Sequence, residues 1–479
     1  MARRLVVGVD SSTQSTKVEA RDVATGDVVA SGVAKHPPTA PPVSEQDPRA
    51  WWAALVDAVA QLGDHRADVV AISVAGQQHG LVLLDAAGDP LRPAKLWNDT
   101  TSATQADRLV AEFGAEQWAQ SIGSVPVASF TITKLAWVTE HEPEVLERAA
   151  SLMLPHDYLT WRLTGEHVTD RGDASGSGWF DPTSNTIVAE FLAAATDGWG
   201  GEVPRVLGPV EPSGIVTTIA AAELGLPQSV VVGPGTGDNM GAALGLGLTA
   251  GDVAISLGTS GTAFAVSDTP THDASGAVAG FASASGNYLP LVCTLNATKV
   301  TDTVARWLGT DPPGLADLAL AASADPGTAV LVPYFDGERT PNLPDATGTF
   351  AGLTNTTTRE QLALAAHDGV LCGLLDGVDA LRAVGATVDG RVFLVGGGSR
   401  SAAYRQRAAD LLGHPVVVPT TDETVATGAA LQAAVVFGGG DFVSVAERWR
   451  LGSGDRVEPR HDAASIRTRY RSTNRPSSH

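Results

Sequence analysis

Cysteine is scarce in this chain of 479 residues, because Cys293 and Cys372 are the only two. Two cysteines allow neither a disulfide framework nor a cysteine-rich zinc site within one chain. Long apolar runs are also missing. No uninterrupted stretch approaches the ~20 residues of a membrane span, and the run Leu5 to Val9 ends at Asp10, short of the about 7–15 apolar residues of a signal peptide. The sequence therefore predicts a cytoplasmic protein without a membrane segment.

Basic residues are few, since 32 lysines and arginines stand against 53 aspartates and glutamates, and the formal net charge is −21. A surface of that sign repels a phosphate backbone, so we expect no nucleic-acid partner. A nucleotide is still compatible where backbone N–H groups, helix N-termini or a metal ion offset the field locally. Apolar residues make up 43% of the chain, which fits large folded cores, and the length favours two large domains.

Common phosphate-binding and hydrolytic motifs are missing too. None of the lysines follows a glycine, so no Walker A loop is present. A G-x-G-x-x-G fingerprint, an H-E-x-x-H zinc helix and a G-x-S-x-G nucleophile elbow are also absent. Any phosphate binding by this chain must use another device.

Two strand-turn-strand segments provide a candidate device. The first has a polar turn at 10–16 and the second a turn at 258–261, and strands are predicted around them at 5–9, 17–23, 27–34, 253–257, 262–266 and 288–293. Small residues let a ligand approach closely, and hydroxyls and successive backbone N–H groups can surround phosphoryl oxygens. Each turn alone is more typical of a simple hairpin. Together they indicate a duplicated core.

The rest of the pattern is typical of an α/β protein. A helix is predicted over 48–62, with Asp47 as its N-cap and Pro48 in its first turn. Further strands are predicted at 69–74, 81–84, 329–333, 391–395 and 416–418, and further helices near 358–384, 401–412 and 424–437. Residues beyond 452 hold several arginines and few apolar residues, and we expect a partly ordered tail there.

Two polar segments next to predicted strands and helices are candidates for chemistry. Asp238 lies in a glycine-rich approach to a predicted helix at 240–248; it fits an N-cap, the more common role, or a general base that accepts a proton from an attacking alcohol. His79 follows Gln77 and Gln78 after a predicted strand. These side chains can donate and accept hydrogen bonds, which suits a polyol, although a lone histidine is more often a structural hydrogen-bonding group.

Two further segments could contact a ligand. The sequence Trp97-Asn98-Asp99 offers an aromatic surface beside two polar groups, and its plain alternative is a packed tryptophan beside an exposed turn. Residues 395–399, Val-Gly-Gly-Gly-Ser, lie between a predicted strand and a predicted helix. Backbone there can pass beneath a flat base while the helix N-terminus faces the ligand, or the segment is an ordinary loop.

Taken in order, these segments resemble the FGGY family of carbohydrate kinases over nearly the whole chain, from Asp10 to about Ala434. The most specific segment is 129–141, which fits the family's first signature, including Lys134 and Trp137. The segments that resemble the xylulose-phosphorylating branch of this family are 44–48, 96–99 and 154–159.

The resemblance implies an α/β protein with the actin-like ATPase fold, in which two ribonuclease-H-like domains border an interdomain cleft. It implies an N-terminal sugar-binding domain at 1–245, a C-terminal nucleotide-binding domain at 246–452 and a tail at 453–479. The implied reaction is ATP-dependent phosphorylation of D-xylulose to D-xylulose 5-phosphate, with Mg²⁺ as cofactor. Its partners are then a small-molecule sugar and ATP, and a homodimer is compatible with it.

The resemblance also implies roles for the candidate residues. Asp238 corresponds to the base that activates the sugar hydroxyl, and Asp10 to the carboxylate that orients Mg²⁺ through water. The expected sugar contacts are Gln78, His79, Asn239, Trp97 and Asp99. The expected nucleotide contacts are Ser12, Thr13 and Lys17 in the first turn, Gly258 and Thr259 in the second, and Gly397, Gly398 and Ser399 after the later strand.

Two departures from the family pattern keep alternatives open. The chain has Gln77-Gln78-His79 where relatives often have Gln-Met-His, and Ser11-Ser12 where glycine is common. Another ketose, a polyol or gluconate is therefore an alternative substrate. A nucleotide-binding regulator that transfers no phosphate is an alternative of a different class, and the presence of both Asp10 and Asp238 argues against it.

Overall fold

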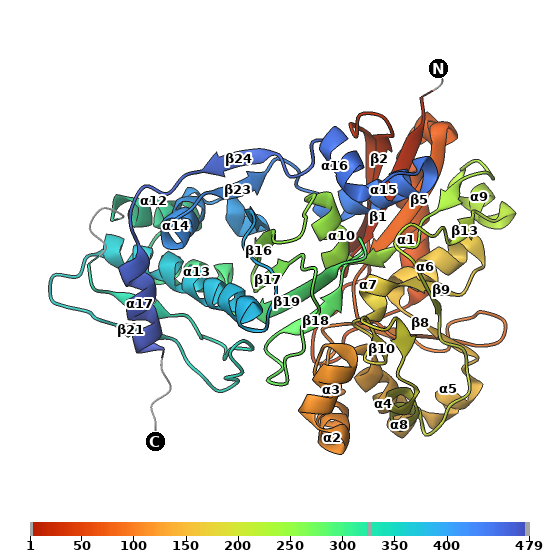
Figure 1. The fold of residues 1–479 in the computed structure, drawn as a ribbon, viewed down its shortest axis with the longest axis horizontal. Coiled ribbons are helices and arrows are strands. Elements are labelled where there is room, and N and C mark those ends of the chain that lie inside the picture. Colours follow the sequence, from red (N-terminus) through yellow and green to blue (C-terminus); the bar gives the residue numbers. More distant parts are fainter. Residues whose placement is uncertain (1–2, 323–326, 475–479) are drawn as a thin grey trace. The chain divides into compact units, whose positions relative to one another are not determined.

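The computed structural model describes residues 3–322 and 327–474 (Figure 1). Contacts divide the chain into two compact units. Unit 1 comprises Met1–Thr249, Pro270–Leu289 and Glu423–Gly452, and unit 2 comprises Ala250–Thr269, Pro290–Asp422 and Ser453–His479. Each unit combines a β-sheet with helices, so the α/β class expected from the sequence is confirmed.

Unit 1 is built on one large sheet. Its strands are β1 (Leu5–Ser11), β2 (Ser15–Asp22), β3 (Val28–Lys35), β5 (Val69–Gly76), β13 (Gly214–Ile215), β14 (Val231–Val232) and β15 (Thr236–Gly237). The order is β13-β14-β5-β1-β2-β3, and β15 also pairs with β5. β1 pairs antiparallel with β2 but parallel with β5. Every residue of β1 is buried, as expected for a strand covered on both faces.

Helices and short strands complete unit 1. The helices are α1 (Pro48–Ala60), α2 (Ala103–Phe113), α3 (Ala115–Ile122), α4 (Thr131–His141), α5 (Pro143–Arg148), α6 (Pro155–Thr164), α7 (Arg171–Ala174), α8 (Ala189–Thr196), α9 (Thr218–Leu224), α10 (Asp238–Gly245), α15 (Thr424–Gly438) and α16 (Phe442–Arg448). The short strands are β4 (Glu45–Gln46), β6 (Val82–Leu84), β7 (Ala94–Lys95), β8 (Ser151–Met153), β9 (Val168–Asp170), β10 (Phe180–Asp181), β11 (Thr186–Ile187), β12 (Arg205–Leu207) and β18 (Ala279–Ala282). The predicted Asp47 cap of α1 is confirmed, because its side chain accepts a hydrogen bond from the Arg49 N–H.

The helix α15 packs on β1, β5 and α10, although it comes from the far end of the chain (Figure 1). Glycines make this approach possible. A Cβ on Gly8 would lie 1.9 Å from the carbonyl oxygen of Ala426, and a Cβ on Gly428 would lie 1.9 Å from that of Gly241. Any side chain at these positions would push the backbones apart.

Unit 2 repeats the core pattern of unit 1. Its main sheet runs β19-β17-β16-β22-β23-β24, formed by β16 (Val253–Leu257), β17 (Gly261–Ala265), β19 (Tyr288–Thr294, in unit 2 from Pro290 on), β22 (Val392–Val395), β23 (Val416–Pro419) and β24 (Gly454–Val457). β16 pairs antiparallel with β17 and parallel with β22, as β1 does with β2 and β5. The duplicated core expected from the two turns is therefore confirmed.

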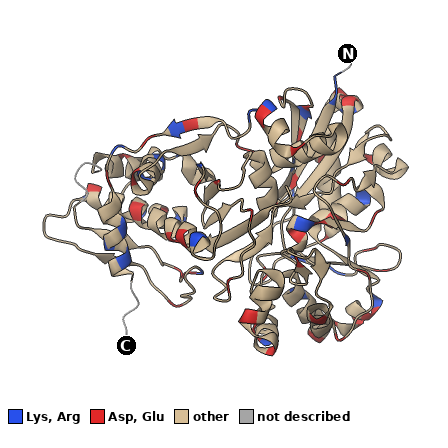
Figure 2. Cartoon of the chain, in the orientation of Figure 1, with Lys and Arg blue, Asp and Glu red and all other residues tan. Residues whose placement is uncertain are grey.

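The other elements of unit 2 pack on this sheet or on one another. They are α11 (Thr298–Trp307), α12 (Pro312–Ala321), β20 (Val330–Val332), β21 (Thr349–Ala351), α13 (Arg359–Ala383), α14 (Ala402–Leu412) and α17 (Ala464–Thr473). Figure 2 shows basic positions on α17 and acidic positions on α13. Arg467 and Arg471 form ion pairs with Asp376 and Asp379. These pairs attach α17, in the arginine-rich segment beyond residue 452, to the rest of unit 2.

Among the residues described, no single helix is long and apolar enough to cross a membrane, and one bent pair, α15 with α16, passes that test on length and composition alone.

Candidate active site

Three strands of unit 1 end side by side and carry the predicted base and its neighbours. β1 and β15 run parallel to β5, and Asp10 and Thr236 both pair with Ala75. Because the carboxyl ends of parallel strands meet at one edge of a sheet, residues that follow them converge there. Asp10 at the end of β1, Gln78 after β5 and Asp238 after β15 therefore lie at the same edge.

Asp238 is the first residue of α10, and Gly237 occupies the N-cap position without a side-chain cap. The N-cap interpretation of Asp238 is therefore wrong, because a capping side chain precedes the first helical residue. Its Oδ1 accepts hydrogen bonds from the Asn239 backbone N–H at 2.8 Å and from Asn239 Nδ2 at 3.0 Å. Burial, together with the charge of nearby Asp10, raises the pKa of Asp238 to about 7. A carboxylate with such a pKa is suited to general-base catalysis.

Asp10 is buried at the same edge. Its carboxylate accepts a hydrogen bond from the Ser12 hydroxyl. Burial raises the pKa of Asp10 to about 6, although the Ser12 bond and the charge of Lys17 oppose the rise. A divalent cation near Asp10 would offset the repulsion between its carboxylate and that of Asp238. Mg²⁺ often binds one or two carboxylates together with water and phosphate oxygens, so these residues fit such an ion. In the described part of the chain no three His, Cys, Asp or Glu side chains form a closed metal cage.

Gln78 and Asn239 connect the ends of β5 and β15. The Nδ2 of Asn239 donates to Gln78 Oε1 at 2.8 Å, so one amide bridges Gln78 and Asp238. The Nε2 of Gln78 is buried and has no hydrogen-bond partner among the described residues. A buried donor without a partner is costly, so this amide is available to an oxygen of a ligand.

His79 is held in a strained conformation at the same place. Its φ of 65° lies in the left-handed region, which residues other than glycine adopt only at a cost in free energy. The ring stacks on Phe130 with centroids 5.0 Å apart, and Nδ1 donates to the Gly176 carbonyl at 2.8 Å. These contacts fix the plane and the tautomer of the ring.

The first predicted phosphate turn is joined to this segment by hydrogen bonds. Thr13 Oγ1 donates to Gln77 Oε1 at 3.1 Å and accepts from Trp97 Nε1 at 3.0 Å. Trp97 is 44% exposed, so its ring is open to a ligand. Lys17 Nζ pairs with both carboxylate oxygens of Glu423, at 2.9 and 2.6 Å. A partly exposed ion pair is worth only about 0–1 kcal/mol, so a phosphate can compete for this lysine.

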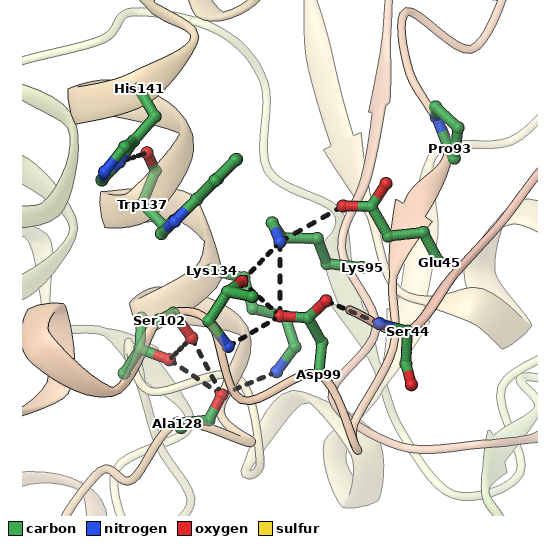
Figure 3. Close-up of polar contacts among 12 residues, drawn as sticks. Ser44, Glu45, Pro93, Lys95, Asp99, Ser102, Ala128, Lys134, Trp137 and His141 are labelled. Carbon is green, nitrogen blue, oxygen red and sulfur yellow. Dashed lines mark hydrogen bonds and ion pairs between the residues drawn. The ribbon is translucent and has the colours of Figure 1, made fainter. Parts of the chain in front are cut away.

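Asp99, a predicted sugar contact, is completely buried. Figure 3 shows its carboxylate surrounded by protein groups: the Ser44 N–H donates to it at 2.9 Å, and Lys95 Nζ lies 3.3 Å away. Lys95 also lies 3.9 Å from the centroid of the Trp137 ring. The Asp99 side chain therefore fixes the loop that carries Trp97 and has no surface of its own open to a ligand.

Lys134, in the signature segment 129–141, has a structural role. It is completely buried. Its Nζ donates to the carbonyl oxygen of Ala128 at 3.1 Å (Figure 3). It also donates to the carbonyl oxygens of Phe130, at 3.4 Å, and Ser129. Burial lowers the pKa of Lys134 to about 7. Through these hydrogen bonds Lys134 fixes the backbone at Phe130, and the His79 ring stacks on the Phe130 ring.

Unit 2 contains a cavity of about 630 Å³. It brings together four of the predicted nucleotide contacts, Gly258, Thr259, Gly397 and Gly398, and its other walls come from α11, α12, α13 and α14. This volume is in the range of small-molecule sites. Ser399 is not in the cavity lining; its hydroxyl donates to the Gly396 carbonyl at 2.8 Å and closes the turn after β22.

Comparison with known proteins assigns both halves of the chain to one group. Residues 5–245 match the N-terminal domain, and residues 253–437 the C-terminal domain, of the FGGY family of carbohydrate kinases. The chain is 50% identical over 455 residues to a xylulose kinase of Streptomyces coelicolor, with 94% of this chain and 92% of that protein covered. It is 48% identical over 457 residues to a xylulose kinase of Streptomyces rubiginosus, with 95% and 92% covered.

Solved structures agree with this assignment. The crystal structure of xylulose kinase from Bifidobacterium adolescentis is 40% identical, covers 99% of this chain and 100% of its own, and superposes with a TM-score of 0.89. A glycerol kinase from Plasmodium falciparum, 18% identical, covers 98% of this chain and 97% of its own with a TM-score of 0.87 and shares the fold. The actin-like ATPase fold expected from the sequence is therefore confirmed.

Proposed function

The chain belongs to the FGGY family of carbohydrate kinases, and from this premise we propose that it transfers the γ-phosphoryl group of ATP to D-xylulose and forms D-xylulose 5-phosphate. The observation that carries the proposal is the position of Asp238, a carboxylate with a near-neutral pKa that Asn239 bridges to Gln78. The relatives named xylulose kinase support the choice of sugar.

In the proposed reaction Asp238 accepts the proton of the C5 hydroxyl while that oxygen attacks the γ-phosphorus. The bond from the γ-phosphorus to the β–γ bridging oxygen breaks, and ADP leaves. Gln78, Asn239, His79 and Trp97 hold the sugar, and we assign Asp99 to support of the Trp97 loop. When bound, Mg²⁺ held through water by Asp10 supplies charge compensation for the phosphate oxygens.

The nucleotide is proposed to bind through the two turns and the later glycine segment. The contacts in this proposal are Ser12, Thr13, Lys17, Gly258, Thr259, Gly397 and Gly398, with Ser399 shaping the turn. In the same proposal residues 1–245 bind the sugar and contribute the first turn to the nucleotide site, and residues 246–452 supply the other nucleotide contacts. The cytoplasmic location and the homodimer stay predictions.

A substrate panel tests the proposal. ADP release from Mg-ATP is measured with D-xylulose, D-ribulose, gluconate, glycerol or no sugar. We expect D-xylulose to stimulate release most strongly. Stronger stimulation by another compound would keep the mechanism and replace the substrate, whereas no stimulation by any of them would favour the non-catalytic alternative.

The activity is expected to depend on pH in a defined direction. Asp238 must be ionised to accept a proton, and its pKa is about 7. As the pH falls below that value the carboxylate becomes protonated, so kcat/KM for the sugar should fall about tenfold per pH unit. Asp10, with a pKa of about 6, should steepen the fall at lower pH. Rates between about pH 5 and pH 9 check this, and a flat profile across neutral pH would contradict it.

A further inference from the structure

Beside the edge described above, unit 1 holds a buried cluster of one histidine and three aspartates. His156 and Asp157 lie in the first turn of α6, Asp170 ends β9, and Asp173 lies in α7. The Nε2 of His156 lies 3.1 Å from Asp157 Oδ1, 3.3 Å from Asp170 Oδ1 and 3.5 Å from Asp173 Oδ2. None of the four side chains is more than 4% exposed, so water does not screen their charges.

Carboxylates that share one buried space repel each other, so this cluster requires a cation or protons. Burial alone would lower the pKa of His156, but the charges of Asp157 and of the two nearby carboxylates Asp170 and Asp173 outweigh it and raise the pKa to about 9. Burial also raises the pKa of Asp173 well above its usual range. Three carboxylate oxygens within 3.5 Å of Nε2 thus favour the cationic form of His156 at the centre of the cluster.

The cluster is bonded to the turn that leads to Asp238. The Thr236 hydroxyl, two residues before the proposed base, donates to Asp170 Oδ2 at 2.9 Å. The imidazole also touches this turn directly, because a Cβ on Gly235 would lie 2.6 Å from His156 Nδ1. The position of the α10 N-terminus, and with it of Asp238, therefore depends on where His156 holds Asp170.

The same cluster supports His79. The Asp170 side chain caps α7 by accepting hydrogen bonds from the Gly172 and Asp173 N–H groups. The chain that leaves α7 presents the Gly176 carbonyl to which His79 Nδ1 donates. Asp170 is therefore connected both to Thr236, which precedes the proposed base Asp238, and to the chain segment whose carbonyl orients His79.

We propose that His156 is a positioning residue for phosphoryl transfer: as a buried cation it holds Asp170, and Asp170 fixes both the turn before Asp238 and the carbonyl that orients His79. The inference rests on the proposed function, because it takes Asp238 as the base. His156 itself touches neither sugar nor nucleotide in this arrangement. Its removal should change catalysis through geometry, to which phosphoryl transfer is sensitive.

Two substitutions at this position separate charge from volume. His156→Gln removes the cation and keeps a polar side chain, whereas His156→Lys supplies a cation again. We expect His156→Gln to lower kcat about 10–10²-fold and to raise KM for D-xylulose, with KM for ATP within about twofold. His156→Lys should recover most of the lost turnover. His414→Gln, at an exposed histidine of unit 2, is the matched control and should behave as the unaltered chain.

Two results would contradict the positioning role of His156. A folded His156→Gln variant that keeps kcat within about twofold, measured well below its melting temperature, would show a role in stability only. A folded His156→Lys variant as impaired as His156→Gln would overturn the role of charge. If His156→Gln does not fold, Thr236→Val tests the far end of the same network: kcat should fall with KM for ATP unchanged, and an unchanged kcat overturns the inference.

A crystal structure of His156→Gln gives a readout that does not depend on the sugar. Displacement of the Thr236 hydroxyl and of the His79 ring relative to the unaltered protein supports the inference, and unchanged positions overturn it. Failure of the proposed function would appear differently, as an unaltered chain that releases no ADP in response to D-xylulose.

Discussion

Replacement of Asp238 by asparagine is expected to lower kcat with D-xylulose by about 10²–10⁴-fold. The amide cannot take the proton of the attacking hydroxyl, but its oxygen can still accept the Asn239 N–H that Asp238 Oδ1 accepts at 2.8 Å. The fold should therefore persist. Turnover is measured by coupled ADP release with ATP and sugar saturating.

The stability of the same variant gives a second check. Because the pKa of Asp238 is raised to about 7, its ionisation destabilises the folded state as the pH rises from the unfolded value near 3.8 through 7. Asparagine does not ionise, so at about pH 8 Asp238→Asn should melt no lower than the unaltered chain. Asp57→Asn, at an exposed position of α1, is the control. Near-normal turnover in Asp238→Asn would remove Asp238 from the role of base.

Substitution of Gly428 by alanine is expected to destabilise unit 1 by about 2–4 kcal/mol. In an ordinary helix interior the same change stabilises by about 1 kcal/mol. Here the new Cβ would lie 1.9 Å from the Gly241 carbonyl oxygen and 2.8 Å from the Gly245 nitrogen. Backbone atoms cannot rotate away as a side chain can, so α10 and α15 must separate, and α10 carries Asp238.

Denaturant unfolding measures this effect, and the same helix supplies the control. A Cβ at Gly438, the last residue of α15, would meet nothing within 4 Å. Gly438→Ala should therefore leave the free energy of unfolding within about 0.5 kcal/mol of the original value. Equal stability of Gly428→Ala and Gly438→Ala would show that the two helices are not packed as closely as the structure has them.

The local elements of the fold could be predicted from the sequence. The sequence predicts strands around the first turn at 5–9, 17–23 and 27–34, and the structure has them as β1, β2 and β3 with small shifts at their ends. The start of α1 was predictable because Asp47 and Pro48 act through local geometry. Such features depend on neighbours in the sequence, which a single sequence displays.

The arrangement of the site residues in space could be predicted less well from the sequence than the local elements. Gln78 and Asn239 are hydrogen-bonded although 161 residues separate them, and the two-residue strand β15 that brings them together has no sequence pattern of its own. The sequence predicts Asp99 as a ligand contact beside Trp97, whereas its carboxylate is buried and pairs with the buried Lys95. The sequence marks His156 only as part of the segment 154–159, since the charge of a histidine depends on neighbours that are distant in the sequence.

The place of α15 in unit 1 has a consequence for biosynthesis. The ribosome synthesises β1 and β5 first, whereas the helix that packs on them, Thr424–Gly438, follows the unit 2 segment Pro290–Asp422 in the chain. Until then an apolar face of the sheet lacks its cover, and such a face in a nascent chain invites aggregation. Unit 1 can therefore reach its final form only after the unit 2 segment Pro290–Asp422 has been synthesised, and protection of the growing chain by chaperones should matter for its yield in cells.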